Sequence, residues 1–178
     1  MNHPSTCVSS RLVAALAVLF LCIAPPSVRA AEPRQPAELI GSPAPDWQLE
    51  TLSGQAQRLS QFRGRAVVLN FWATWCAPCR METKWLAELH ARYKADGLVV
   101  LGVSMDEASD RAEVVRFTKF YGVNYPILLQ GQTIAAHYGG IQYLPQTFFL
   151  DRTGKIVNVT RGIQDKETLA EDILRILR

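Results

Sequence analysis

The fold of this chain is decided by the stretch Trp72-Ala73-Thr74-Trp75-Cys76-Ala77-Pro78-Cys79-Arg80. Before it, residues 66–72 form an almost continuous run of apolar, β-branched and aromatic side chains, which is typical of a central strand buried on both faces. After it, apolar residues recur at spacings of three and four across residues 81–93, which predicts an amphipathic helix. The two cysteines therefore stand at a strand-to-helix junction, where a Cys-x-x-Cys pair indicates a redox-active dithiol.

The remaining segments predict an α/β domain. Residues 47–51 and 57–59 form a predicted hairpin, and residues 146–150 and 155–160 form a second one around a tight turn at 151–154. Between the hairpins we expect strands at 98–104 and 127–129 and helices at 110–122 and 132–138, with a last helix after Asp165. This order of elements implies a central mixed β-sheet that is flanked by helices on both faces.

The first thirty residues have the pattern of a secretory signal peptide. Arg11 supplies a positive charge, residues 12–24 form an apolar segment of 13 residues, and Val28-Arg29-Ala30 provides a small-x-small cleavage site. The apolar segment is shorter than the roughly 20 residues that span a bilayer. We therefore expect a signal peptide at 1–30, a linker at 31–41, a globular domain at 42–178 and a periplasmic or otherwise exported location. The alternative is an uncleaved N-terminus that anchors the domain to the inner membrane, facing the periplasm.

The composition fits one soluble domain and gives no sign of a nucleic-acid partner. The chain has 178 residues, of which 48% are hydrophobic and 20% are charged, which is enough for one sizeable core. Removal of Arg11 and Arg29 with the signal lowers Lys plus Arg from 19 to 17, against 16 Asp plus Glu. The exported chain is therefore close to neutral, and no basic patch for nucleic acid is expected.

The cysteine count favours redox chemistry over a metal site. Cys7 and Cys22 fall inside the predicted signal, so only the Cys-x-x-Cys pair would remain after cleavage. A structural zinc site needs two further ligands, and the domain offers only His90 and His137, which do not form a paired pattern. We expect no metal.

The position of the pair assigns a role to each sulfur. At a helix N-terminus, Cys76 faces unpaired backbone N–H groups and the positive end of the helix dipole, both of which lower the pKa of a thiol. Cys79 lies one turn later on the same face, where it can attack a mixed disulfide. Cys76 is therefore the predicted nucleophile and Cys79 the resolving thiol, and the redox-active disulfide Cys76–Cys79 is the only cofactor we expect.

Two longer motifs extend beyond the cysteines, namely Leu69-Asn70-Phe71-Trp72-Ala73-Thr74-Trp75-Cys76-Ala77-Pro78-Cys79-Arg80-x-Glu82 and Tyr143-Leu144-Pro145-Gln146-Thr147-Phe148-Phe149-Leu150-Asp151-x-x-Gly154. With the export signal, residues 40–178 resemble the TlpA/ResA-like thiol–disulfide oxidoreductases of the thioredoxin superfamily. The resemblance implies a thioredoxin-like fold with an N-terminal hairpin and an inserted helix and strand. It also implies disulfide-containing protein substrates and electron delivery from a membrane-embedded thiol reductant.

The resemblance also implies a wall opposite the dithiol. Pro145 corresponds to the family's cis-proline, which packs against the active-site sulfurs; an ordinary strand-starting proline is the alternative. The backbone of Leu144 would then be free to pair with an extended segment of the substrate. Trp75 is expected to shield the nucleophilic sulfur.

The resemblance also implies that the residue that transfers a proton lies on the helix after the dithiol and not on the strand before it. Asn70 stands where thioredoxin has a buried aspartate that accepts a proton, and an asparagine cannot titrate. Glu82 matches an acid that the TlpA/ResA-like branch carries near the dithiol, where it could raise the pKa of a thiol or relay the proton of Cys79. The alternative is a glutamate that only stabilises the first turn of the helix through the dipole.

The direction of electron flow follows from the residues between the cysteines. Strong oxidants of the superfamily place a histidine there, whereas Ala77-Pro78 supplies no charge to stabilise the thiolate, so the pair should be reducing. We therefore expect an exported reductase, and the family resemblance implies apocytochrome c or copper-site cysteines as its substrates. Two alternatives stay open: a copper-binding oxidase assembly protein of the SCO type, and a thiol peroxidase with antioxidant activity.

Overall fold

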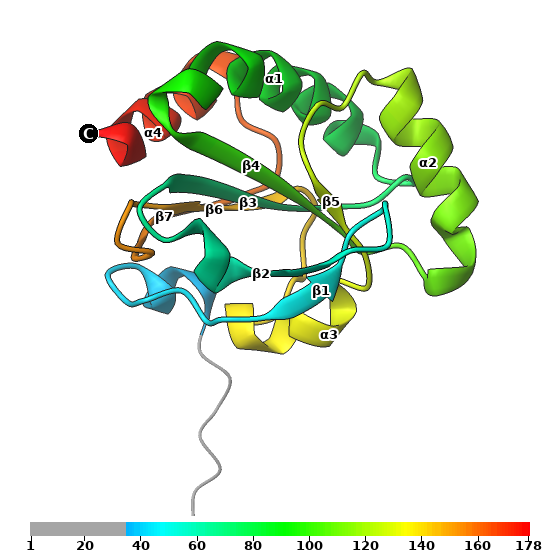
Figure 1. Ribbon diagram of the computed structural model, residues 1–178, viewed down its shortest axis with the longest axis horizontal. Coiled ribbons are helices and arrows are strands. Elements are labelled where there is room, and N and C mark those ends of the chain that lie inside the picture. Colours follow the sequence, from blue (N-terminus) through cyan, green and yellow to red (C-terminus); the bar gives the residue numbers. More distant parts are fainter. Residues whose placement is uncertain (1–34) are drawn as a thin grey trace, which may run out of the picture. The chain divides into compact units, whose positions relative to one another are not determined.

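A five-stranded sheet forms the centre of the computed structural model, which describes residues 35–178 (Figure 1). The strand order is β5-β4-β3-β6-β7; β3, β4 and β5 run parallel, and β6 and β7 are antiparallel to their neighbours. The predicted mixed sheet is therefore confirmed. Its strands are β3 (Ala66–Trp72), β4 (Leu98–Ser104), β5 (Ile127–Leu128), β6 (Gln146–Leu150) and β7 (Ile156–Arg161).

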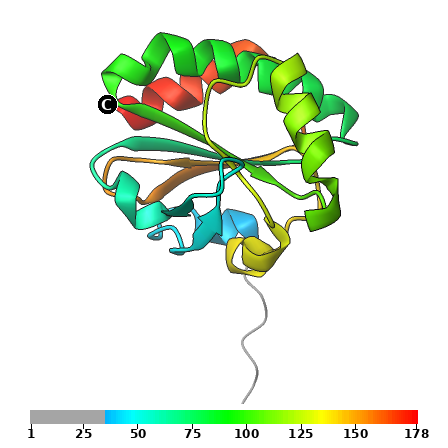
Figure 2. The same cartoon turned by 45° about the vertical axis from the view of Figure 1, so that its right-hand side comes forward.

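Helices cover both faces of the sheet, as the two views in Figures 1 and 2 show. On one side lie α1 (Ala77–Tyr93), α2 (Arg111–Phe120) and α4 (Lys166–Leu177), and on the other lie the hairpin of β1 (Gln48–Glu50) and β2 (Ala56–Arg58) and the short helix α3 (Gln132–Ala135). The thioredoxin-like α/β fold, with its N-terminal hairpin and an inserted helix and strand in α2 and β5, is confirmed. Five 3₁₀ turns complete it: η1 (Pro36–Leu39), η2 (Leu59–Phe62), η3 (Lys94–Asp96), η4 (Ala108–Asp110) and η5 (Ala136–Tyr138).

The N-terminal part of the chain differs in one respect from the expected linker at 31–41. Pro36–Leu39 forms the turn η1, and both Pro36 and Leu39 are buried. The backbone N–H of Gly41 also bonds to the carbonyl of Ile156 at 2.8 Å, which ties this segment to β7. The predicted signal peptide and its alternative, a membrane anchor, fall on residues outside the described part. Between residues 35 and 178, no helix is both long and apolar enough to cross a membrane.

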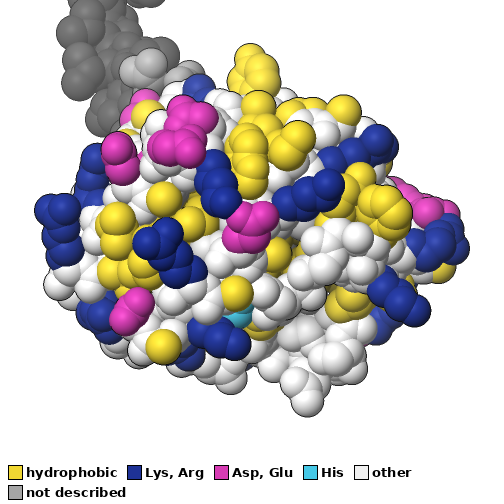
Figure 3. All heavy atoms as spheres, turned by 90° about the horizontal axis from the view of Figure 1, so that it is seen from above, with side chains coloured by type: hydrophobic (Ala, Val, Ile, Leu, Met, Phe, Trp, Pro, Cys, Tyr) yellow, Lys and Arg dark blue, Asp and Glu magenta, His cyan; other side chains and the backbone are white. Residues whose placement is uncertain are grey.

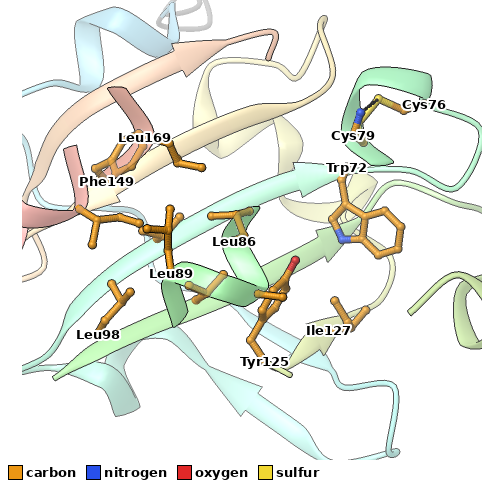
Figure 4. Packing of buried hydrophobic residues seen from close by; sticks show 14 of the residues in the cluster. Trp72, Cys76, Cys79, Leu86, Leu89, Leu98, Tyr125, Ile127, Phe149 and Leu169 are labelled. Carbon is orange, nitrogen blue, oxygen red and sulfur yellow. Dashed lines mark hydrogen bonds between the residues drawn. A yellow bond between two sulfur atoms is a disulfide. The ribbon is translucent and has the colours of Figure 1, made fainter. Parts of the chain in front are cut away.

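Strand β3 separates two hydrophobic clusters. All seven of its residues are buried. Because side chains alternate along a strand, Val68 and Trp72 point into the cluster under α1 and α4, whereas Leu69 and Phe71 point into the cluster under the hairpin and α3. Figure 4 shows the first cluster, with Trp72 at the end that lies nearest to the cysteines.

Gly102, in the middle of β4, is required by the close approach of three buried side chains. A Cβ atom at this position would lie 2.6 Å from Cδ1 of Ile127, 3.0 Å from Nε1 of Trp72 and 3.1 Å from Cε2 of Tyr125. Packed interiors have few voids that could absorb such an overlap. The absence of a side chain therefore leaves room for Trp72, the last residue of β3 before the active-site loop.

We predict that Gly102→Ala lowers the free energy of unfolding by about 1–3 kcal/mol, because the new methyl group overpacks this point of the core. Ile127→Val removes the Cδ1 atom that would clash most severely. In a denaturant-unfolding cycle, the double variant Gly102→Ala/Ile127→Val should therefore lose less stability than the two single changes summed. Strictly additive losses would contradict the assigned contact.

Candidate active site

The dithiol lies where β3 passes into α1. Cys76 is the N-cap of α1, in extended backbone conformation, and its Sγ accepts a hydrogen bond from the backbone N–H of Cys79 at 3.3 Å. Figure 4 shows this bond and the disulfide that joins the two residues. Pro78 occupies an early position of the helix, where no backbone N–H is needed. A thiolate at Cys76 would therefore be stabilised by helix N–H groups and by the dipole.

The two sulfurs differ in their access to solvent. Cys76 is 5% exposed and Cys79 is 1% exposed. Cys76 also lines an open groove of about 500 Å³ together with Trp75, Pro78 and Leu144. Cys79 does not line it. A substrate sulfur can therefore approach Cys76 first, which agrees with the predicted order of attack.

The loop before β6 forms the opposite wall of this groove, which we call the sulfur groove. Leu144 lines it, and the peptide bond between Leu144 and Pro145 is cis. Pro145 itself is buried and does not line the groove. The structure thus brings Trp75, Cys76 and Leu144 together around one hollow, while the functional roles of Leu144 and Pro145 stay predictions.

Glu82 lies on the buried side of α1, one turn after Cys79, and is 1% exposed. The side-chain amide of Asn70, on β3, donates to Oε2 of Glu82 at 2.7 Å and to Oγ1 of Thr147, on β6, at 2.8 Å. Asn70 therefore connects β3 with the carboxyl group of Glu82 on α1 and with the hydroxyl group of Thr147 on β6. The proton-transfer role of Glu82 stays a prediction.

Burial raises the pKa of Glu82 from 4.5 to about 7, against the opposing effect of hydrogen bonds from Asn70 and Thr147. Loss of hydration disfavours the charged carboxylate more strongly than these two neutral donors favour it. An exposed glutamate that served only the helix dipole would not show such a shift. A carboxyl group that titrates near neutral pH can hold or release a proton during thiol exchange.

Asp106 is a residue of the site that the sequence analysis missed. It is 3% exposed, and its carboxylate accepts hydrogen bonds from the backbone N–H of Thr74 at 3.1 and 3.2 Å, from the Thr74 hydroxyl at 2.6 Å and from the Ser104 hydroxyl at 2.8 Å. Thr74 stands two residues before Cys76, so Asp106 fixes the loop that carries the nucleophile. An acid just beyond the carboxyl end of the parallel strand next to β3 was the available signal.

We predict that Asp106→Ala lowers the free energy of unfolding by about 1–3 kcal/mol, because it leaves the partly buried N–H of Thr74 and the hydroxyl groups of Thr74 and Ser104 without their acceptor. Thr74→Val should cost less, since the backbone N–H of residue 74 keeps its bond to Asp106. Stopped-flow reaction of the reduced protein with 2-hydroxyethyl disulfide should also show a slower rate for Asp106→Ala, whose loop is no longer anchored. Wild-type stability and rate in this variant would contradict the anchoring role.

Metal-ligating side chains do not gather in the described residues. No group of three or more His, Cys, Asp or Glu side chains between residues 35 and 178 has the geometry to hold a metal ion. His90 is instead bonded to the side chain of Asn124 at 3.0 Å.

Comparison with known proteins places the chain in a family. Residues 40–159 match the AhpC/TSA family. The thiol–disulfide oxidoreductase ResA of Geobacillus thermodenitrificans is 35% identical over 137 residues, which cover 77% of this chain and 78% of that protein. ResA of Bacillus subtilis is 33% identical and covers 78% of this chain and 75% of its own.

Solved structures give the same result. A putative thiol:disulfide interchange protein DsbE from Chlorobium tepidum superposes with a TM-score of 0.71 at 31% identity, over 78% of this chain and 98% of that one. A secreted thiol-disulfide isomerase from Corynebacterium glutamicum gives a TM-score of 0.69 at 29% identity, over 75% and 84% of the two chains. The chain therefore belongs to the AhpC/TSA family of the thioredoxin superfamily, and it is a thiol–disulfide oxidoreductase related to ResA and DsbE.

Proposed function

We propose that this oxidoreductase is an exported reductase of protein disulfides, with Cys76 as nucleophile and Cys79 as resolving thiol. The observation that carries the proposal is the asymmetry of the pair: Cys76 opens onto the sulfur groove, whereas Cys79 faces the interior on the same helix as the buried Glu82. One sulfur is thus placed for attack on a partner and the other for intramolecular resolution.

The reaction consists of two exchanges. The Cys76 thiolate attacks one sulfur of the substrate disulfide, so that a Cys76–substrate disulfide forms and the other substrate sulfur leaves as a thiolate. The Cys79 thiol loses its proton and attacks Sγ of Cys76, which forms the Cys76–Cys79 disulfide and releases the second substrate thiolate. The substrate gains two electrons and the enzyme loses two. Glu82 is the group we assign to accept the proton of Cys79, because it is buried one turn after Cys79 on the same helix and burial raises its pKa to about 7.

The reducing direction is supported by the charges around the pair. Ala77 and Pro78 place no positive charge between the sulfurs, so the thiolate form of the enzyme gains no extra stabilisation there. The ionised form of Glu82 would further disfavour a thiolate on Cys79. The helix N-terminus is then the main stabilising influence on the thiolate, and a dithiol that lacks an additional positive charge gives up its electrons more readily than that of a strong oxidant.

The wider context of the proposal rests on the family resemblance and on the predicted signal peptide. After each turnover the enzyme holds a disulfide, and a thiol donor must reduce it; a membrane-embedded thiol reductant would do so from outside the cytoplasm. Export is supported by the N-terminal pattern of the sequence and by a solved relative that is itself described as secreted. Apocytochrome c cysteines and copper-site cysteines are the substrates we propose.

Trapping tests this function directly. Cys79→Ala should freeze Cys76 in mixed disulfides with its substrates, which diagonal gels and mass spectrometry would identify, whereas Cys76→Ala should trap none. The redox potential of the wild-type pair should lie closer to that of thioredoxin, about −270 mV, than to that of a strong oxidant, about −120 mV. A strongly oxidising potential would contradict the reductase assignment, and rapid peroxide consumption by the reduced protein would favour a peroxidase instead.

Glu82 should make the stability of the oxidised protein depend on pH. Its carboxyl group ionises near pH 4.5 in the unfolded chain and near pH 7 in the folded protein. The unfolded state therefore binds fewer protons between these values, and stability should fall by about 3 kcal/mol as the pH rises from 4.5 to 7. Glu82→Gln should flatten this slope in urea titrations, whereas Glu167→Gln, at an exposed position, should leave it unchanged. A wild-type slope in Glu82→Gln would show that another group causes it.

A further inference from the structure

A second groove lies beside the dithiol, between the start of α1 and the last turn of α2. It is open, has a volume of about 890 Å³, and is lined by Trp75, Arg80, Arg116, Phe117, Lys119 and Phe120 among others. We call it the α2 groove. It is larger than the sulfur groove, and the exchange chemistry described above makes no use of it.

Two large aromatic side chains project into solvent at the α2 groove. Phe120 is 80% exposed and Trp75 is 68% exposed, although burial of such a side chain is worth about 1.5–3 kcal/mol. Figure 3 shows hydrophobic side chains lying among Lys and Arg side chains on the face above α1. Aromatic residues kept at the surface beside a catalytic group are typical of a contact area for another molecule.

The aromatic wall of the groove is backed by a continuous stack that reaches the core. The ring centroid of Phe120 lies 5.0 Å from that of Tyr121, Tyr121 lies 4.4 Å from Phe117, and Phe117 lies 4.5 Å from Trp72. Such contacts favour particular ring orientations. Phe120 therefore lies against a row of packed aromatic rings, which lowers the cost of ordering it when a partner binds.

The charge of the α2 groove is positive. Arg80, Arg116 and Lys119 line it, and Lys84 lies over the ring of Tyr121 at 5.5 Å from the centroid. Glu113 is the single acid of the lining, and it already pairs with Arg116. Neither Arg80 nor Lys119 belongs to an ion pair among residues 35–178. The unpaired charge favours an occupant that carries carboxylates.

Trp75 connects the α2 groove with the sulfur groove, because its side chain lines both. Its neighbour in the chain, Cys76, lines only the second. A polypeptide whose disulfide reaches Cys76 can therefore cross Trp75 and lay its next residues in the α2 groove. An open surface of this kind suits a polypeptide segment better than a small molecule, which binds in enclosed pockets.

We infer that the α2 groove binds the segment of the protein substrate that adjoins its disulfide, and that it selects an aromatic or aliphatic side chain flanked by Asp or Glu. The inference rests on the proposed reductase function and adds a substrate preference to it. Phe120 and Trp75 supply the apolar contact, and Lys119 and Arg80 pair with the flanking carboxylates. The groove thereby distinguishes substrates that have the same disulfide.

Reduction of synthetic peptides tests the preference. Each peptide carries a Cys-x-x-Cys disulfide and, two to six residues away on either side, Asp-Phe-Glu, Lys-Phe-Lys or Asp-Ala-Glu. For the spacing that fits, kcat/KM of the reduced wild-type enzyme should be about tenfold higher with Asp-Phe-Glu than with either other sequence, which corresponds to about 1.4 kcal/mol. The advantage over Lys-Phe-Lys should shrink as salt is raised from about 20 to 500 mM.

Variants of the groove should change this preference and leave the chemistry intact. Lys119→Glu should remove most of the preference for Asp-Phe-Glu over Lys-Phe-Lys, because it brings the charge of the groove lining close to zero. Lys94→Glu, the same charge change beyond the far end of α1, should leave the preference unchanged. Phe120→Ala should remove the advantage of Phe over Ala, whereas Val115→Ala, at another exposed position of α2, should keep it. All four variants should reduce 2-hydroxyethyl disulfide at the wild-type rate. While this small uncharged molecule reacts at Cys76, it is too short to extend into the α2 groove.

The outcomes separate this inference from the proposed function. If the wild-type enzyme reduces 2-hydroxyethyl disulfide and all peptides equally well at every spacing, the reductase function stands and the substrate preference is wrong. If it reduces none of them, the proposed function fails, and the preference with it. Binding of the wild-type protein, but not of Lys119→Glu, to phosphatidylglycerol vesicles without any peptide preference would assign the groove to a membrane surface and overturn the inference.

Discussion

Strand β3 holds the active site in place because it is paired on both edges and buried on both faces. It forms hydrogen bonds with β4 on one side and β6 on the other, and none of its seven residues is exposed. The loop that leaves it has only three residues before Cys76, and Asp106 anchors that loop at Thr74. The nucleophile is thus fixed by the most constrained strand of the sheet, which suits a reaction that requires aligned sulfur atoms.

The same strand also contacts the buried acid Glu82. Asn70 reaches across from β3 to Glu82 on α1, and the carboxyl group lies out of contact with water. Two competing effects act on it: desolvation raises its pKa, and hydrogen bonds lower it, with desolvation the stronger. Burial thus brings the pKa of this acid to about 7, on the same helix as Cys79 and one turn after it. Such a group can move a proton without adding a permanent positive charge that would make the dithiol oxidising.

The two tryptophans near the dithiol differ in burial because β3 ends between them. Trp72 is the last residue of β3 and packs on Phe117 in the core, next to the space that Gly102 leaves open. Trp75 follows in the loop and is largely exposed. It lies between the sulfur groove and the α2 groove and lines both, so that one residue borders the site of chemistry and the proposed site of substrate selection.

The local sequence pattern was sufficient to predict the dithiol, the central strand and the helix that follows it. The apolar run at 66–72, the helical spacing at 81–93 and the two cysteines lie close together in the chain, and secondary structure depends mainly on such short-range periodicity. The positions of Glu82, Pro145 and Leu144 came from the resemblance of longer motifs. The turn η1 could not be predicted, because a four-residue turn has no periodicity and its residues become buried only through contacts with distant parts of the chain.

Only the tertiary structure brought together the residues that hold and surround the dithiol. Asp106 bonds to a residue 32 positions earlier, and Thr147 bonds to Asn70 across 77 positions. The α2 groove is formed by residues from the first turn of α1 and the last turn of α2. Phe120 is exposed there, although the sequence does not distinguish it from the aromatic residues of α2 that point into the core. By itself the sequence determined which chemistry the chain performs, because that chemistry depends on neighbouring residues. The sheet decided which charges and surfaces face the sulfurs, because contacts between distant segments arise only when strands pair and helices pack.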